Sequence, residues 1–249
     1  MFTFKQSDRP SVGTNQGHAL PKRHDPDPRD DNMREEFQAD LNEVSRLLVT
    51  MAEAVRAALR KATSALLTAD LKAAESVIEQ DIQIDKIYSQ VESKVADTIA
   101  RQAPVAGDLR MVITALHISA DLERMGDLAE HVAKTARRRH PSPAVPAELR
   151  PVFKDMAEVA DQMAEKIATL LAKPDAEQAA ALEGADDAMD DLERRLFQVM
   201  LDDDWPYGAE TAIDGALLGR FYERYADHAV NIGGQLVFLV TGEPVDNQN

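Results

Sequence analysis

The 249-residue chain contains no cysteine, few aromatic residues and no long apolar run. Without cysteine, disulfide bonds and thiolate-bound metal sites are excluded, and a reducing compartment suits the composition. No apolar stretch approaches the length that spans a membrane, and the N-terminus lacks the apolar core of a signal peptide. We therefore expect a cytoplasmic protein that is not inserted in the membrane.

Basic residues are also scarce. Twenty-eight Lys and Arg against 44 Asp and Glu give a net charge of −16. Residues 1–32 carry equal numbers of basic and acidic residues, which places the whole excess in residues 33–249. An acidic body argues against binding to nucleic acid or directly to anionic lipid, and it suits cations or basic protein surfaces.

Helical periodicity dominates the chain after residue 32. Residues 1–32 hold four prolines and no apolar periodicity, and we expect them to be disordered. Met33 is an alternative translation start. Six long helices are expected, over about residues 33–69, 71–103, 108–139, 146–173, 174–204 and 209–240.

The two halves of the chain repeat each other. Met51-Ala52-Glu53 matches Met156-Ala157-Glu158, Asp70 matches Asp175, and the string E-R-x-x-D recurs. An ordered series of matches in one register indicates a duplication. We therefore predict an all-α fold, a tandem repeat of two antiparallel three-helix bundles. The predicted division is an extension (1–32), a first bundle (33–140), a linker (141–146), a second bundle (147–241) and a flexible tail (242–249).

Paired acidic residues stand at equivalent places in the two halves. Random placement of 44 acidic residues already gives about eight pairs at i,i+4 spacing. An isolated pair is therefore most simply part of a solvated helix face, and position must single out the important ones. The candidate pairs are Asp81 and Asp85, Glu123 and Asp127, Asp186 and Asp190, and Glu223 and Asp227.

One of these pairs continues an apolar stripe. The stripe advances by four and three residues, the spacing of a bundle core. Glu123 and Asp127 thus stand where leucine is expected, and carboxylates there are costly unless paired, protonated or bound to metal. The stripe reads Leu109, Ile113, Leu116, Ala120, Glu123 and Asp127.

Two other apolar stripes are interrupted by acids. Asp81 lies within the stripe of residues 77–95, and Asp186 lies within that of residues 182–200. Asp81 and Asp85 have no Lys or Arg three or four residues away, and ion pairs within their helix cannot neutralise them. Carboxylate clusters without cationic partners are typical of cation sites.

Helix-surface ion pairs are the alternative interpretation. Arg124 precedes Asp127 by three residues, and Arg220 precedes Glu223 by three, which permits such pairs. The protein would then be a metal-free scaffold whose acids line a docking face for a basic partner.

A metal held by these carboxylates would be a hard ion. Iron, manganese, magnesium or calcium fits best, and zinc is less natural. His131 lies four residues after Asp127, on the same face, and is a candidate ligand. His228 follows Asp227 directly and points about 100° away, which favours a packing role or a role beside the ligands.

Three strings in the chain are specific enough to suggest a family. They are RQAPVAGDLR at 101–110, DLERMGD at 121–127 and YERYADHA at 222–229. With them, residues 33–240 resemble the PhoU family of phosphate-specific transport system accessory proteins. The resemblance implies two homologous three-helix bundles, negative regulation of phosphate uptake and of the phosphate-starvation response, and no enzymatic activity.

The resemblance also implies cofactors and partners. Each repeat would hold a multinuclear cluster of metal ions, and the family partners would be the ATPase of a phosphate ABC transporter, a sensor histidine kinase and a second copy of the chain. The implied ligands are Asp81, Asp85, Glu123 and Asp127 in the first repeat, and Asp186, Asp190, Glu223 and Asp227 in the second.

The second repeat departs from the first. It has Ala226 where the first has Gly126, and Asp187 with Asp191 competes for the role of Asp186 with Asp190. The sequence therefore supports the first site more strongly.

A carboxylate-bridged multi-metal enzyme or a metal-storage bundle is a further alternative. That class uses Glu-x-x-His, and no histidine here has a glutamate three residues before it.

Overall fold

The computed structural model describes residues 28–243, and within them all regular structure is helical. The all-α prediction is confirmed. The helices are α1 (Pro28–Thr68), α2 (Leu71–Gln102), α3 (Gly107–Arg139), α4 (Arg150–Ala172), α5 (Ala176–Ala180), α6 (Glu183–Met200) and α7 (Gly208–Thr241).

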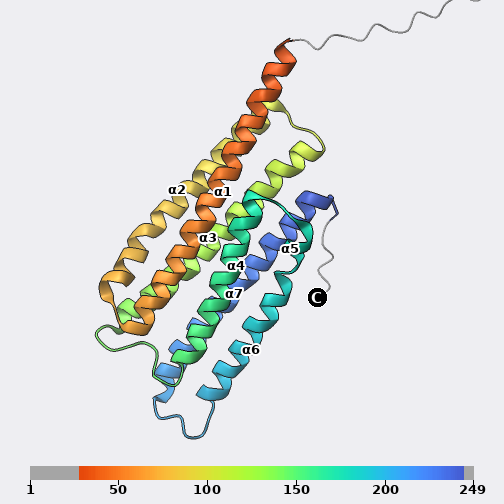
Figure 1. Ribbon diagram of the computed structural model, residues 1–249. Helices are drawn as coiled ribbons and strands as arrows, with labels where there is room; N and C mark the ends of the chain where they lie inside the picture. Colours follow the sequence, from red (N-terminus) through yellow and green to blue (C-terminus); the bar gives the residue numbers. More distant parts are fainter. Residues whose placement is uncertain (1–27, 244–249) are drawn as a thin grey trace, which may run out of the picture.

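The helices form two bundles that lie side by side (Figure 1). Helices α1, α2 and α3 pack against one another in the first bundle, and α4 to α7 form the second. The bundles meet along two helix pairs, α1 with α4 and α3 with α7, and their buried apolar residues form one continuous core. The tandem repeat therefore buries its halves against each other.

Duplicated residues start corresponding helices. The carboxylate of Asp70 accepts a hydrogen bond from the amide of Ala73 at 3.0 Å, at the start of α2. Asp175 caps α5 in the same way, from the amide of Gln178 at 2.9 Å. Because a cap satisfies an otherwise unpaired helix amide, both halves mark this boundary by the same device.

Helix boundaries differ from the prediction at the starts of α1 and α4, and within the fifth predicted helix. Helix α1 begins at Pro28 and not at Met33, so that disorder is a wrong prediction for residues 28–32; residues 1–27 and 244–249 lie outside the described part. Helix α4 begins at Arg150, with a proline in its first turn, where proline is well tolerated.

The expected fifth helix is broken in two. Helix α5 ends at Ala180 and α6 begins at Glu183. Gly184 follows the break and lowers the helix propensity there. A methyl group at Gly233 of α7 would lie 2.9 Å from the carbonyl oxygen of Ala179, which shows that α5 packs closely on α7.

Polar contacts tie the two bundles together beside the apolar core. Arg56 of α1 makes a bidentate ion pair with Asp161 of α4, with nitrogen–oxygen distances of 2.7 and 2.8 Å. The hydroxyl groups of Thr63 and Tyr222 are 2.6 Å apart in the buried contact between α1 and α7. These contacts favour one arrangement of the bundles.

No helix in residues 28–243 combines the length and the apolar character that crossing a membrane requires.

Candidate metal centres

The apolar stripes of α2 and α6 are core, as predicted. Val77 and Ile84 are buried on α2, and Leu182 and Met189 are buried around the start of α6. Asp81, between the two α2 residues, is half-buried, as is Asp186 between the other two. Both carboxylates therefore interrupt a packed face.

The stripe of α3 is a wrong prediction. Leu109 is 39% exposed and Ile113 is 38% exposed, whereas Val112 and Ile118 of the same helix are buried. Helix α3 packs on α1, α2 and α7 at once, and this sets its buried face about one residue away from the predicted stripe. Glu123 and Asp127 accordingly lie at the edge of the packed face, with side chains 23% and 33% exposed.

The first cluster forms where α2 meets α3. A methyl group at Gly126 would lie 3.0 Å from Cδ1 of Ile84 and 3.5 Å from Oδ1 of Asp81. Gly126 therefore lets α2 approach closely, next to Asp127. The structure brings the acids of the two helices into one region, as the spacing predicts.

Charge repulsion is evident in this cluster. Burial, followed by the nearby Glu130, Asp85 and Asp127 carboxylates, raises the pKa of Asp81 to about 6. Burial also raises the pKa of Glu123, followed by the repulsion of Asp127. These acids resist ionisation because they are crowded and partly removed from water.

Two cations partly neutralise the first cluster. Arg124 lies 3.5 Å from Oε2 of Glu123 and 3.1 Å from Oδ2 of Asp127, and Lys134 pairs with Glu130. Surface ion pairs of the kind expected from the spacing are therefore present. Asp81 and Asp85 have no such pair in the part of the chain that the structure describes.

The second cluster forms where α6 meets α7. Burial, followed by the charges of Asp227 and Asp190, raises the pKa of Asp186 to about 6. Burial, followed by the charge of Asp227, raises the pKa of Glu223 to about 7. The four acids predicted for the second repeat therefore share one region.

Two carboxylate oxygens of the second cluster are buried without a hydrogen-bond partner among residues 28–243: Oδ1 of Asp186 and Oε2 of Glu223. Arg220 pairs with the other oxygen of Glu223. Because an unpaired buried carboxylate oxygen is costly, these atoms identify the point in this cluster at which a cation would help most.

The competing pair in α6 faces solvent. Asp187 is exposed, and the side chain of Asp191 is 71% exposed and pairs with Arg194. The half-buried Asp186, in contrast, points into the contact with α7. Asp190 is exposed as well, but its charge raises the pKa of both Asp186 and Glu223, whereas Asp191 acts on neither.

The clusters are not finished coordination shells. Among residues 28–243, no three His, Asp or Glu side chains converge closely enough to ligate one ion. The acids of each cluster lie in one region and repel one another. Binding one metal ion together would require their side chains to turn toward a common centre.

The two candidate histidines occupy the contact between α3 and α7. The Nδ1–H group of His131 donates to the carbonyl oxygen of its own Asp127 at 2.6 Å, and its ring packs on Phe221 at a centroid distance of 5.3 Å. Nδ1 of His228 lies 2.9 Å from Oδ1 of Asp121 in the opposite bundle. His228 therefore bridges the bundles.

Two acidic neighbours were absent from the predicted sets. Glu130 raises the pKa of Asp81, and Glu193 raises that of Glu223. Glu130 lies three residues after Asp127, on the adjoining helix face, and that spacing is the signal that would have identified it.

Comparison with known proteins identifies the family. The family profile described as the PhoU domain matches residues 48–136 and 153–236, one match in each bundle. The phosphate-specific transport system accessory protein PhoU homolog 1 of Mycobacterium tuberculosis is 44% identical over 210 residues, covering 84% of this chain and 95% of that protein. The PhoU homolog of Aquifex aeolicus is 34% identical over 214 residues, with the same coverage.

Solved structures agree with these relatives. The phosphate transport system regulatory protein PhoU from Streptococcus pneumoniae superposes with a TM-score of 0.74 at 27% identity, covering 84% of this chain and 99% of that chain. PhoU from Pseudomonas aeruginosa also gives 0.74, at 28% identity, covering 83% and 100%. Sequence, fold and the paired matches agree, and the chain belongs to the PhoU family.

Proposed function

We propose that this protein is a non-enzymatic regulator of phosphate uptake that binds hard metal ions at its two carboxylate clusters. Its relatives are named as accessory or regulatory proteins of phosphate transport, and the chain covers nearly their whole length. An accessory role in phosphate transport follows from that kinship. The metal ions and the regulatory partners rest on the arguments below.

One observation carries the metal proposal. Oδ1 of Asp186 and Oε2 of Glu223 are buried and have no hydrogen-bond partner in the described part of the chain, and the pKa values of both carboxyl groups are raised. Carboxylate oxygens are the donors that hard cations prefer, and this donor set fits iron, manganese or magnesium, with zinc less suited.

The same logic assigns the groups that would hold the ions. A bound cation would supply the positive charge that these crowded carboxylates lack, and a cluster of several ions would serve more of them. The residues are Asp81, Asp85, Glu123 and Asp127 in the first bundle, and Asp186, Asp190, Glu223 and Asp227 in the second.

The regulatory proposal is that the protein works in the cytoplasm by docking on other proteins. Its acidic surface speeds association with basic surfaces. The proposed partners are the ATPase of the phosphate ABC transporter and a sensor histidine kinase, both restrained when phosphate is plentiful, and the acting form is a homodimer.

Metal analysis tests the first half of the proposal. Protein purified without added metal, and protein dialysed against Mn²⁺, should retain bound metal after desalting. Asp186→Asn combined with Glu223→Gln should lower the metal content, while Asp187→Asn at the exposed neighbouring position should leave it unchanged. If wild type retained no metal in either preparation, the acids would belong to a metal-free scaffold.

Deleting the gene tests the second half. Phosphate-starvation genes should switch on in phosphate-rich medium, and the wild-type gene should restore repression. Full repression and unchanged phosphate uptake after deletion would contradict the regulatory role, whatever the metal content.

A further inference from the structure

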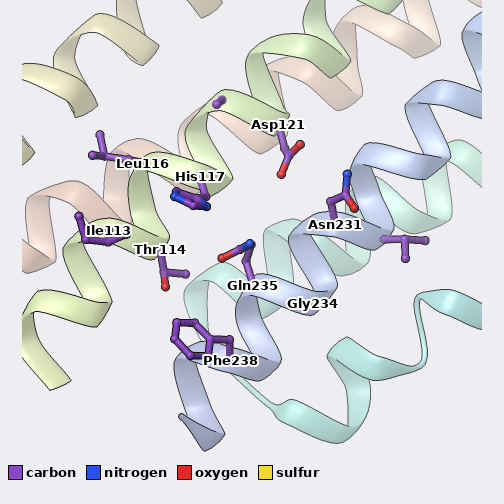
Figure 2. Close-up of a pocket in the computed structure, with 11 residues that line it drawn as sticks. Ile113, Thr114, Leu116, His117, Asp121, Asn231, Gly234, Gln235 and Phe238 are labelled. Atoms are coloured by element: carbon purple, nitrogen blue, oxygen red, sulfur yellow. The ribbon is translucent and has the colours of Figure 1, made fainter. Parts of the chain in front are cut away.

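A groove of about 800 Å³ opens between α3 and α7, beside the first half of α3. Figure 2 shows His117 and Asp121 of α3 directed toward Asn231 and Gln235 of α7. Phe238 adds an aromatic ring from the last turns of α7. The groove thus has polar groups from both bundles and an apolar lining.

An apolar stripe that the chain buries only in part runs along this groove. Leu109 and Ile113 are more than a third exposed, and the stripe continues through Leu116 to Ala120. Ile113, Leu116 and Ala120 line the groove. The steps of four, three and four residues are those by which a helix packs on another helix, yet no helix of residues 28–243 covers the outer members.

Gly234 provides space for an occupant in the lining of the groove. A methyl group added there would meet no atom within 4 Å. The missing side chain leaves room for a side chain of an occupant.

Charge indicates the chemistry of the occupant. The stripe that lines the groove as far as Ala120 continues into Glu123 and Asp127 of the first cluster, three and seven residues later on the same face of α3. The chain as a whole carries a charge of −16. A helix that covers the stripe from Leu109 to Ala120 spans about 17 Å, and it would place one end beside these acids.

We infer that the α3–α7 groove of the metal-free chain receives an amphipathic helix of a partner protein, with apolar residues at three- and four-residue spacing and Lys or Arg at the acidic end. Amphipathic helices bind grooves of this kind through such anchors. This inference rests on the proposed function as a docking regulator and names the surface that docks.

Synthetic peptides test the inference on the full, metal-free chain. The probe carries leucines at this spacing with lysines elsewhere; one comparator has the same composition in scrambled order, and another has glutamate for lysine. Fluorescence anisotropy should show both comparators binding at least about tenfold more weakly than the probe. Gly234→Leu fills the groove and should weaken the probe about tenfold. Gly184→Leu on α6, which also meets nothing within 4 Å, should leave it unchanged.

Four results would overturn the inference. If the scrambled peptide bound as tightly as the probe, charge alone would explain the binding. If Gly234→Leu bound the probe as tightly as wild type, the peptide would bind outside this groove. Self-association of the wild type that Gly234→Leu abolishes would make the occupant a second copy. Tighter peptide binding after deletion of residues 1–27 would make it the chain's own N-terminal segment. None of these results bears on the gene-deletion experiment, which tests the proposed function alone.

Discussion

The two carboxylate clusters differ in how far cationic side chains compensate the repulsion between their acidic groups. In the first, Arg124 lies near both Glu123 and Asp127. In the second, Arg220 pairs with one oxygen of Glu223, and two buried carboxylate oxygens have no partner within residues 28–243. The second cluster therefore carries the larger uncompensated cost, and a bound cation should stabilise it more.

The helix contacts beside the two clusters differ at two residues, and the change at one compensates for the change at the other. In the first bundle, Gly126 leaves room for the branched Ile84. In the second, Ala226 stands at the position equivalent to the glycine, and Met189 at the position equivalent to the isoleucine, both fully buried. A flexible methionine accommodates a methyl group that isoleucine would resist. The alanine of the second repeat is thus compatible with a close helix contact.

The largest effect expected from this comparison is metal-dependent stability. Mn²⁺ at about a hundredfold excess over its dissociation constant would add about 2.7 kcal/mol to the free energy of unfolding. For a chain of this size that corresponds to roughly 5–10 °C in Tm. Asp186→Asn with Glu223→Gln should remove more of this gain than Asp81→Asn with Glu123→Gln, as measured by calorimetry with Mn²⁺ and with chelator.

The ranking of the two pairs is the critical outcome. Equal losses would mean that the unpaired oxygens do not distinguish the clusters. A larger loss from the first-bundle pair would restore the order that the sequence favours. Circular dichroism of each variant with chelator shows whether its helix content is retained.

The helix contact gives an intermediate effect. In Gly126→Ala the new methyl group would lie 3.0 Å from Cδ1 of Ile84, and this crowding should outweigh the roughly 0.5–1 kcal/mol that alanine gains over glycine within a helix, so that the free energy of unfolding falls. Adding Ile84→Met recreates the pair found in the second bundle and should recover most of the loss. Urea unfolding of both single variants and the double variant measures the coupling. If the losses in unfolding free energy of the two single variants simply added in the double variant, Met at position 84 would not compensate for Ala at position 126.

The sequence predicted the parts of this structure that depend on one helix or one repeat. The stripes of α2 and α6 follow from local periodicity, and the duplication pairs Asp70 with Asp175, which the structure shows to be helix caps. The stripe beginning at Leu109 was assigned to the core because its spacing is right for one. Its exposure depends on how α3 is shared between α1, α2 and α7, a contact between the halves that no local pattern records.

The same limit explains the ranking of the sites. Considered alone, Ala226 in place of a glycine argues for a weaker second site. The residue that compensates for it, Met189, lies on another helix. The unpaired oxygens of Asp186 and Glu223 depend on side-chain burial, and spacing alone does not give burial. The acidic pairs themselves could be predicted from the sequence because the duplication places them at equivalent positions in the two halves.

The smallest expected effect is the pH dependence of the metal-free protein, and Asp186 is the residue that isolates it. Its pKa is about 6 in the folded chain against 3.8 for an ordinary aspartate, and folding therefore takes up protons. The stability that this carboxyl contributes is complete below about pH 4 and is lost as the pH rises through about 6. Asp186→Asn cannot ionise and should lose less stability between pH 4.5 and 7.5 than wild type, in thermal unfolding with chelator. Asp187→Asn, at the exposed neighbouring position, should follow the wild-type curve, and equal behaviour of the two variants would show that burial does not raise the pKa of Asp186.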